Sequence, residues 1–178
     1  MTTGHVFIAT SLDGYVARQD HSLDWLLKQP AAEGDDGGFA AFMDSVDGLV
    51  MGTGSFRTLL GFDAWPYTKP VVVLSSSLTA QDIPEQLTDK VRFSTATPAD
   101  LMQKLQKEGW KRAYVDGGRL VQSFLRRGLI ADLTITTVPV LIGSGIPLFG
   151  NLDKDIDLKV ANSRILPAGM VQTTFTVV

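Results

Sequence analysis

The sequence predicts an α/β fold whose central sheet is mixed and mostly parallel, with antiparallel C-terminal strands and flanking helices. Short apolar strand-like runs alternate with helix-like segments up to about residue 128, which is typical of parallel strands joined by right-handed crossovers. Beyond that point the chain continues as three strand-like segments linked by short turns. Such a run of strands predicts antiparallel additions at one edge of the sheet.

The composition favours a single domain that spans residues 1–178. A chain of 178 residues buries roughly 70% of the surface that its unfolded form exposes, and no linker or repeat divides it. Without cysteine, the chain offers no disulfide, no thiolate metal site and no cysteine nucleophile. Neither His5 nor His21 has the close His or carboxylate neighbours that a metal site needs, so we expect no bound metal.

The charge pattern argues against nucleic acid and membranes as partners. The net charge is −3, the basic residues are scattered, and no basic stripe is interleaved with aromatic side chains. No apolar stretch approaches the roughly 20 residues that span a bilayer, and the first residues lack the pattern of a secretory signal. We therefore expect a cytoplasmic protein that acts on a small molecule.

The first predicted elements place a carboxylate at the end of a strand. Residues 5–10 form a compact apolar run suited to a central strand, and the Leu-Asp-Gly turn that follows puts Asp13 at its end. Residues 22–27 are predicted to form a short helix capped by Ser22, with Trp25 as its largest side chain.

An acidic loop and a second short helix come next. Residues 30–38 form a loop by composition, and its acids Glu33, Asp35 and Asp36 are interpreted either as a solvated surface or as a lid beside a pocket. Three apolar side chains at helical spacing then predict a helix that ends near residue 47: Phe39, Phe42 and Met43.

Two stretches join a buried strand to a helix through glycines. In residues 49–60 the turn is Gly52-Thr53-Gly54-Ser55, and in residues 113–128 it is Asp116-Gly117-Gly118. Glycines leave the backbone open to an incoming anion, and the free N–H groups of a helix's first turn carry partial positive charge. Each turn is therefore a candidate phosphate-binding site.

The remaining predicted elements complete the sheet. Residues 71–78 form a strand that ends in hydroxyl groups at Ser75 to Ser77, and residues 98–108 form an amphipathic helix capped by Thr97. The closing strands are residues 131–141, 158–166 and 171–178. Ligands of open α/β sheets gather outside the carboxyl ends of the strands, so both glycine turns and the serine turn are expected on one rim.

Standard motifs for other chemistries are absent from the sequence. The turn that begins at Gly52 lacks the final glycine of G-x-G-x-x-G, and no G-x-x-x-x-G-K-[ST] occurs. No serine lies in G-x-S-x-G, and neither histidine is placed for a Ser-His-Asp triad. A classical dinucleotide fold, a P-loop and a serine hydrolase are therefore not supported.

The order of the remaining motifs is similar to that of a known family. The series ATSLDGYVA, SLDW, LVMGTGSF, VVVLSSS, AYVDGGRLVQSFL and TTVPVLIGSGIPLF resembles the C-terminal reductase domain of the bacterial riboflavin-biosynthesis deaminase/reductase. The resemblance covers almost the whole chain and implies a dihydrofolate reductase-like, three-layer fold. It also implies a reductase that uses NADPH and forms a homodimer, with the C-terminal strands as the expected contact.

The resemblance implies cofactor-binding roles for particular residues. The second glycine junction would hold the pyrophosphate and nicotinamide ribose through Gly117, Gly118, Arg119, Leu120 and Val121. The first would hold another phosphate through Gly52, Thr53, Gly54 and Ser55. The adenine ribose would lie against Ser75 and Ser76, and the nicotinamide against the backbone of Ala9 and Thr10.

Three residues are predicted to act at the reacting end: Asp13, Asp116 and Trp25. Asp13 is interpreted as a turn-forming residue or a group at the pocket floor, and Trp25 as a core aromatic or a wall beside the nicotinamide. Asp116 is interpreted as a substrate contact or as a helix cap.

The predicted reaction is hydride transfer from NADPH to a C=N or C=O carbon of a small heterocyclic or ribosylamino-pyrimidine-like substrate. A proton would come from Asp13, Asp116 or an ordered water. Similar sequences have Gly-Arg where this chain has Gly52-Thr53, so NADH stays open as an alternative cofactor. The alternative functions are dihydrofolate reductase proper, although residues 25–29 offer no carboxylate, and a non-catalytic NADP(H)-binding module.

Overall fold

A computed structural model describes residues 1–30 and 35–178. Glu33, one of the acids of the predicted loop, lies outside the described residues. The strands are β1 Thr3–Ser11, β2 Tyr15–Ala17, β3 Gly48–Gly52, β4 Val71–Leu74, β5 Val91–Ser94, β6 Arg112–Asp116, β7 Ile130–Val138, β8 Ile146–Pro147, β9 Leu158–Ile165 and β10 Val171–Val177. The α-helices are α1 Asp24–Leu27, α2 Phe39–Ser45, α3 Thr53–Leu60, α4 Pro98–Lys107 and α5 Gly118–Leu125, and the 3-10 turns are η1 Ala80–Asp82, η2 Glu85–Leu87 and η3 Pro167–Gly169.

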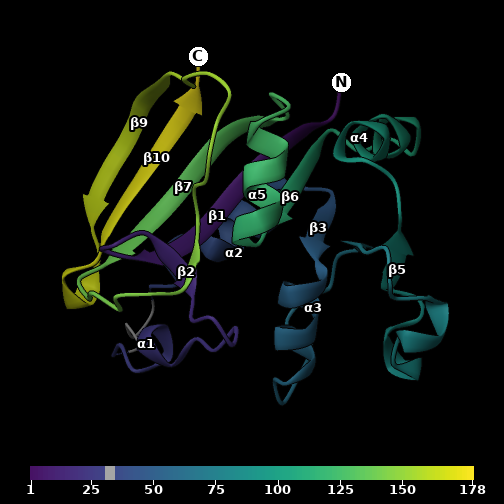
Figure 1. Ribbon diagram of the computed structural model, residues 1–178, viewed down its shortest axis with the longest axis horizontal. Helices are drawn as coiled ribbons and strands as arrows, with labels where there is room; N and C mark the ends of the chain where they lie inside the picture. The colour runs from purple at the N-terminus through teal and green to yellow at the C-terminus, as the bar shows by residue number, and fades with distance from the viewer. Residues whose placement is uncertain (31–34) are drawn as a thin grey trace.

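An eight-stranded sheet organises the molecule, with the strand order β5-β4-β3-β6-β1-β7-β10-β9. All neighbours from β5 to β7 run parallel, and β10 runs antiparallel to both β7 and β9. Figure 1 shows the C-terminal hairpin β9–β10 at one side of the sheet and β5 at the other. The predicted mixed sheet with antiparallel C-terminal strands is confirmed.

Helices cover both faces of the sheet and give it three layers. On one face, α4 and α5 bury their apolar sides against alternate residues of β6, β3 and β4, including Val115, Val50 and Val72. On the other face, α2 and α3 pack against a second cluster that contains Leu49, Met51 and the aromatic ring of Tyr114. Figure 1 shows α5 in front of the sheet and α2 behind it.

The structure corrects some of the predicted boundaries. Helix α1 begins at Asp24 after an N-cap at Leu23 without a side-chain hydrogen bond, so Ser22 is not its cap. Helix α3 begins at Thr53, because the predicted glycine turn already forms its first residues. The cap of α4 is confirmed, since the Thr97 hydroxyl accepts a hydrogen bond from the Asp100 N–H at 3.2 Å.

Strand β1 is paired unequally on its two sides. Its ladder with β7 extends from Gly4 to Ser11, whereas its ladder with β6 ends at the pair His5–Tyr114. Strand β6 continues beside β3 as far as the pair Met51–Asp116. The backbone edge of β1 from Phe7 to Ser11 therefore has no strand partner on the β6 side, and we call this opening in the ladder the β1–β6 gap.

Candidate functional site

The carboxyl ends of the parallel strands bring the predicted turns together. Met51 pairs with Asp116, and Gly52 pairs with Leu74, which immediately precedes Ser75. The two glycine junctions and the serine turn therefore lie side by side on one rim, as the sequence predicted. In Figure 1 the start of α3 lies at this rim, directly after the end of β3.

The β1–β6 gap leaves backbone groups of β1 at this rim without a strand partner. Backbone groups along a strand point alternately to its two neighbours: the Thr3 N–H donates to Lys111 O beside β6, and the Leu12 N–H donates to Val140 O beyond β7. By this alternation, the backbone N–H and C=O groups of Ala9 point to the gap, and those of Thr10 point to β7. A planar amide is a suitable ligand for such a donor–acceptor pair.

The turn between β3 and α3 is open. A Cβ atom built on Gly52 would meet no other atom within 4 Å, and Gly52 has an ordinary extended backbone with φ −87°. Gly52 is the N-cap of an eight-residue helix whose first turn contains no acidic residue and no side-chain cap. The amide groups of that turn can therefore receive an anion.

The turn between β6 and α5 is more enclosed. Gly117 has φ +98°, a conformation that favours glycine, and a Cβ there would lie 2.6 Å from Ser55 Oγ. A Cβ on Gly118 would lie 2.5 Å from the carbonyl oxygen of Pro147. Packing against β8 thus already requires a glycine at position 118.

The predicted contacts along α5 differ in what they can offer. Val121 is buried in the core, and its N–H donates to Gly117 O at 2.9 Å. The side chain of Arg119 is exposed and that of Leu120 is half-buried. An anion at this helix would therefore contact the amides of the first turn and the Arg119 side chain. Val121 instead stabilises the turn through its hydrogen bond to Gly117 O and its packing in the core.

The serine turn after β4 has one structural and one free hydroxyl. Ser75 is buried, and its Oγ accepts hydrogen bonds from the Ser77 N–H at 3.2 Å and the Leu78 N–H at 2.9 Å. Ser76 is exposed. Of the two, Ser76 has its side chain available to a ligand.

Asp116 is a half-buried carboxyl on the rim. Its Oδ1 lies 3.3 Å from Tyr114 Oη, and the Tyr114 hydroxyl also lies 2.8 Å from the carbonyl oxygen of Phe7. Burial raises the pKa of Asp116, against the opposing effect of hydrogen bonds from Ser55, Tyr114 and the Gly117 N–H. Raised carboxyl pKa values at strand ends are typical of groups that give or take a proton.

Asp13 is exposed and fixes a loop. Its carboxylate accepts hydrogen bonds from the Gly143 N–H at 2.8 Å and from the Ile142 N–H at 3.1 Å. Hydrogen bonding by Ser11 and by these amides lowers the pKa of Asp13. An ionised carboxylate held in this way suits a structural role at the rim better than proton donation.

Trp25 is fully buried, with none of its surface exposed. Its indole Nε1 is buried without a hydrogen-bond partner among the described residues. A buried N–H normally finds a partner, so Trp25 is a packed aromatic with one unsatisfied donor.

His21 is a residue that the sequence reasoning did not assign to the site. It has φ +68°, and its ring lies on the first turn of α3, where a Cβ on Gly54 would be 2.5 Å from His21 Cε1. No local motif signals this contact, because the loop after β2 brings the histidine to a helix more than thirty residues further along the chain. His5, by contrast, is buried in β1, with Nδ1 2.7 Å from Asp132 Oδ2.

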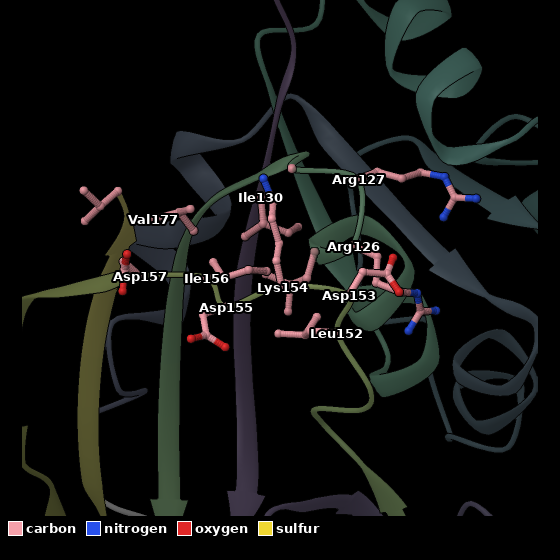
Figure 2. Close-up of a pocket in the computed structure, with 13 residues that line it drawn as sticks. Arg126, Arg127, Ile130, Leu152, Asp153, Lys154, Asp155, Ile156, Asp157 and Val177 are labelled. Atoms are coloured by element: carbon pink, nitrogen blue, oxygen red, sulfur yellow. The ribbon is translucent and has the colours of Figure 1, made fainter.

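A cavity of about 580 Å³ lies at the other end of the sheet. Figure 2 shows it beside Ile130, at the start of the parallel strand β7, and Val177, at the end of the antiparallel strand β10. Its charged lining is balanced, with three basic and three acidic side chains: Arg126, Arg127, Lys154, Asp153, Asp155 and Asp157. The balance of charge and the distance from the glycine turns set it apart from the candidate site.

No group of metal-ligating side chains occurs in residues 1–30 and 35–178. Within the same residues, none of the helices is both long and apolar enough to cross a bilayer.

The sheet order, the two glycine junctions and the closing antiparallel strands define a protein of the dihydrofolate reductase-like class. The family model of the RibD C-terminal domain matches residues 3–172. The chain belongs to this family.

Relatives support this assignment. The uncharacterised protein YwjB of Bacillus subtilis (strain 168) is 31% identical over 163 residues, which are 89% of each chain. A crystal structure described as a "putative riboflavin biosynthesis protein" from Shewanella sp. PV-4 is 41% identical and has a TM-score of 0.93 over 99% of both chains.

A more distant structure shares the fold alone. The diaminohydroxyphosphoribosylaminopyrimidine deaminase/5-amino-6-(5-phosphoribosylamino)uracil reductase of Thermotoga maritima is 11% identical, with a TM-score of 0.77. The match covers 99% of the present chain and 57% of the Thermotoga chain.

Proposed function

We propose that this protein is an NAD(P)H-dependent reductase that acts on a small heterocyclic or ribosylamino-pyrimidine-like substrate. The observation that carries the proposal is the shared rim, where an open glycine turn, a second glycine turn and a half-buried carboxyl lie near the β1–β6 gap. Membership of the RibD C-terminal domain family supports a reductase of this class. A cytoplasmic location is part of the proposal.

The residues on the rim fit a dinucleotide. The open space at Gly52 leaves room for a phosphate against the first turn of α3, and the first turn of α5 with Arg119 provides a second anion site. Ala9 would bind the carboxamide of a nicotinamide through its backbone. When bound, the reduced nicotinamide supplies a hydride.

His21 is the side chain that we propose for cofactor specificity. It lies beside the phosphate turn at Gly54, whereas Arg57 extends from the last turn of α3. An imidazole next to a phosphate can donate a hydrogen bond to it. We therefore expect NADPH as the cofactor, with NADH bound less tightly.

Asp116 is the proposed proton donor. It is half-buried at the end of β6, and its partial removal from water favours its protonated form. Asp13, which we had also considered, is engaged by two backbone amides and exposed. Asp13 is proposed instead to hold the loop after β7 against the rim.

Calorimetric titration with NADPH and NADH tests the cofactor site. Gly52→Val fills open space without a clash in the protein, so we expect it to fold normally and to bind NADPH at least tenfold more weakly than wild type. Gly61→Ala, at the other end of the same helix, is the control and should bind as wild type does. Equal affinity of wild type and Gly52→Val, or no binding by either, would contradict the proposal.

Turnover assays then separate the candidate reactions. Consumption of NADPH with a ribosylamino-pyrimidine phosphate or another heterocycle supports the proposed reductase. Methotrexate-sensitive turnover of dihydrofolate would identify a dihydrofolate reductase instead. Tight binding of NADPH without turnover of any carbonyl, pterin or ribosylamino-pyrimidine would identify a binding module.

We also propose that the protein forms a homodimer through the β9–β10 hairpin. Strand β9 is at the edge of the sheet and all eight of its residues are exposed. Cross-strand pairs place apolar side chains on one face of the hairpin, since Val160 pairs with Phe175 and Ile165 with Val171. An exposed apolar edge of this kind is normally covered by a partner.

A further inference from the structure

We propose that Tyr114 is a positioning residue whose hydroxyl hydrogen changes its acceptor with the protonation state of Asp116. Its hydroxyl bonds to the Phe7 carbonyl while Asp116 carries a proton, and it turns to Asp116 when that carboxyl is ionised. This inference rests on the proposed function, in which Asp116 gives a proton to the substrate.

A count of hydrogens leads to this assignment. Tyr114 has one hydroxyl hydrogen and two acceptors within reach, Phe7 O at 2.8 Å and Asp116 Oδ1 at 3.3 Å. The Phe7 carbonyl can only accept, so when it holds the hydrogen, the Tyr114 oxygen faces Asp116 with a lone pair. That arrangement is favourable only if Asp116 carries a proton. An ionised Asp116 needs the hydrogen for itself.

The Phe7 carbonyl is free to take part because of the β1–β6 gap. The ladder between the two strands ends at the pair His5–Tyr114, so no N–H of β6 reaches Phe7. The side chain of Tyr114, rather than the backbone of β6, meets this carbonyl. The gap that admits a ligand thus also provides the second acceptor of the Tyr114 hydroxyl.

Aromatic packing holds the Tyr114 ring in place while its hydroxyl hydrogen turns. Tyr114 is only 4% exposed, and Phe42 meets its ring edge-on at a centroid distance of 5.0 Å. Phe39 lies edge-on at 6.5 Å, and Phe7 packs on Phe42 at 5.0 Å. The oxygen of Tyr114 is therefore fixed, and only the O–H direction is adjustable.

Asp116 has two hydroxyl partners, Ser55 and Tyr114, and only Tyr114 has a second acceptor in the Phe7 carbonyl. Tyr114 comes from β6, Tyr67 from the segment before β4, and Ser55 from α3; these side chains and the Gly117 N–H are the partners that act on Asp116 or on Tyr114. No charged side chain of the described residues contributes to the raised pKa of Asp116, whose main cause is burial. Tyr67 is buried as well, and burial raises the pKa of its hydroxyl.

The proposed change of hydrogen-bond acceptor by Tyr114 has one consequence for the reaction. As a C=N or C=O carbon of the substrate receives a hydride, the carboxyl O–H bond of Asp116 breaks and its proton goes to the substrate nitrogen or oxygen. The negative charge left on Asp116 is then met by the hydroxyl hydrogen of Tyr114, whose own O–H bond stays intact. Because the hydrogen is already within reach, little rearrangement is needed.

The test is a pH titration of the Asp116 carboxyl by carbon NMR in protein labelled at aspartate, without cofactor, with Asp116→Asn to assign the signal. Tyr114→Phe keeps the ring and removes the hydroxyl, and we expect the titration midpoint to rise by about one pH unit, as for the loss of one hydrogen bond to a charged group. Tyr15→Phe, which removes a hydroxyl from β2, is the control and should leave the midpoint unchanged. An unchanged or lower midpoint in Tyr114→Phe would overturn the proposal.

A second measurement tests the proposal independently of the carbon NMR signal of Asp116. The loss of thermal stability in Tyr114→Phe should be larger at pH 8 than at pH 4 if the hydroxyl serves the ionised carboxylate. An equal loss at both pH values would overturn the proposal. Calorimetric titration with NADPH is independent of both readouts, so a failure of the proposed function can be told apart from a failure of this inference.

Discussion

At the scale of single residues, the surroundings of two carboxyl groups on the same rim shift their pKa values in opposite directions. Asp13 is exposed, and hydrogen bonds from Ser11 and two backbone amides lower its pKa, whereas removal from water raises the pKa of the half-buried Asp116. The two groups are of one chemical type, so their environment decides which of them holds a proton more tightly.

Asp116→Asn should stabilise the protein at neutral and alkaline pH. A raised pKa means that the stability associated with Asp116 is complete below its ordinary value of 3.8 and is lost as the pH rises through the value in the folded protein. An amide does not ionise, so the variant avoids that loss. We expect a higher Tm than wild type at pH 8 and a smaller difference at pH 4, by calorimetry.

The matched control for this measurement is Asp63→Asn, in an exposed loop. It should leave Tm unchanged at both pH values. If Asp116→Asn gave the same Tm difference at pH 4 and pH 8, ionisation of Asp116 would not be the cause of the effect.

Asp13→Asn should loosen the loop after β7. The carboxylate holds the amides of Ile142 and Gly143, and an uncharged side chain makes weaker hydrogen bonds. We expect faster hydrogen exchange at these two amides, measured by NMR. Asp20→Asn, whose carboxylate holds only the neighbouring Ser22 amide, is the control. Unchanged exchange in Asp13→Asn would show that the loop is held by other contacts.

At the scale of elements, the C-terminal hairpin positions the start of α2. Gln172 on β10 is only 6% exposed, and its Nε2 donates to Gly37 O at 2.9 Å and Thr136 Oγ1 at 3.0 Å. Its Oε1 accepts from Arg164 Nε at 2.9 Å. Phe39 and Phe42, which pack against the ring of Tyr114, are on α2. The Gln172 side-chain amide therefore links the C-terminal hairpin to the candidate site.

Gln172→Ala should destabilise the fold by about 1–3 kcal/mol, because it leaves buried partners unsatisfied. Chemical denaturation gives this value. The control is Thr174→Ala, on the same strand as Gln172, which removes the 3.0 Å hydroxyl contact with Thr134 on β7 and should cost less than about 1 kcal/mol. Equal losses for the two variants would contradict a special role for Gln172.

The elements also show what a sequence can predict. Runs such as residues 49–51 and 71–74 are wholly apolar because both faces of a central strand are buried, so their position was evident. Strand β5 was missed, since it alternates with Arg92 and lies at the edge. Strands β2 and β8 have three and two residues, and their pairing depends on contacts far apart in the chain.

The candidate site was predictable where it follows strand ends, and not where it depends on loops. The adjacency of Gly52 and Asp116 follows from parallel strands, whose carboxyl ends meet at one edge. The contact of His21 with Gly54 and the packing of Gly118 on Pro147 depend on how loops return to the rim. A local sequence pattern carries no information about either of these two contacts.

At the scale of the whole molecule, the proposed contact between two chains is the exposed β9–β10 hairpin. Light scattering should give the mass of two chains for wild type. The double variant Val160→Glu, Ile165→Glu places charges on the apolar face of the hairpin and should give the mass of one chain. Leu27→Glu, at an exposed apolar residue of α1, is the control and should remain dimeric. A monomeric wild type would contradict the proposed assembly.

The gap between β1 and β6 has a consequence for how the fold can diversify. Both of its walls are backbone anchored in a continuous sheet, through the long ladder with β7 on one side and the pairing of β6 with β3 on the other. A cofactor held by such walls would meet main-chain atoms that are the same whatever the side chains are. The loops after β1 and β7 are then free to change with the substrate, so new specificities can arise without rebuilding the redox half of the site.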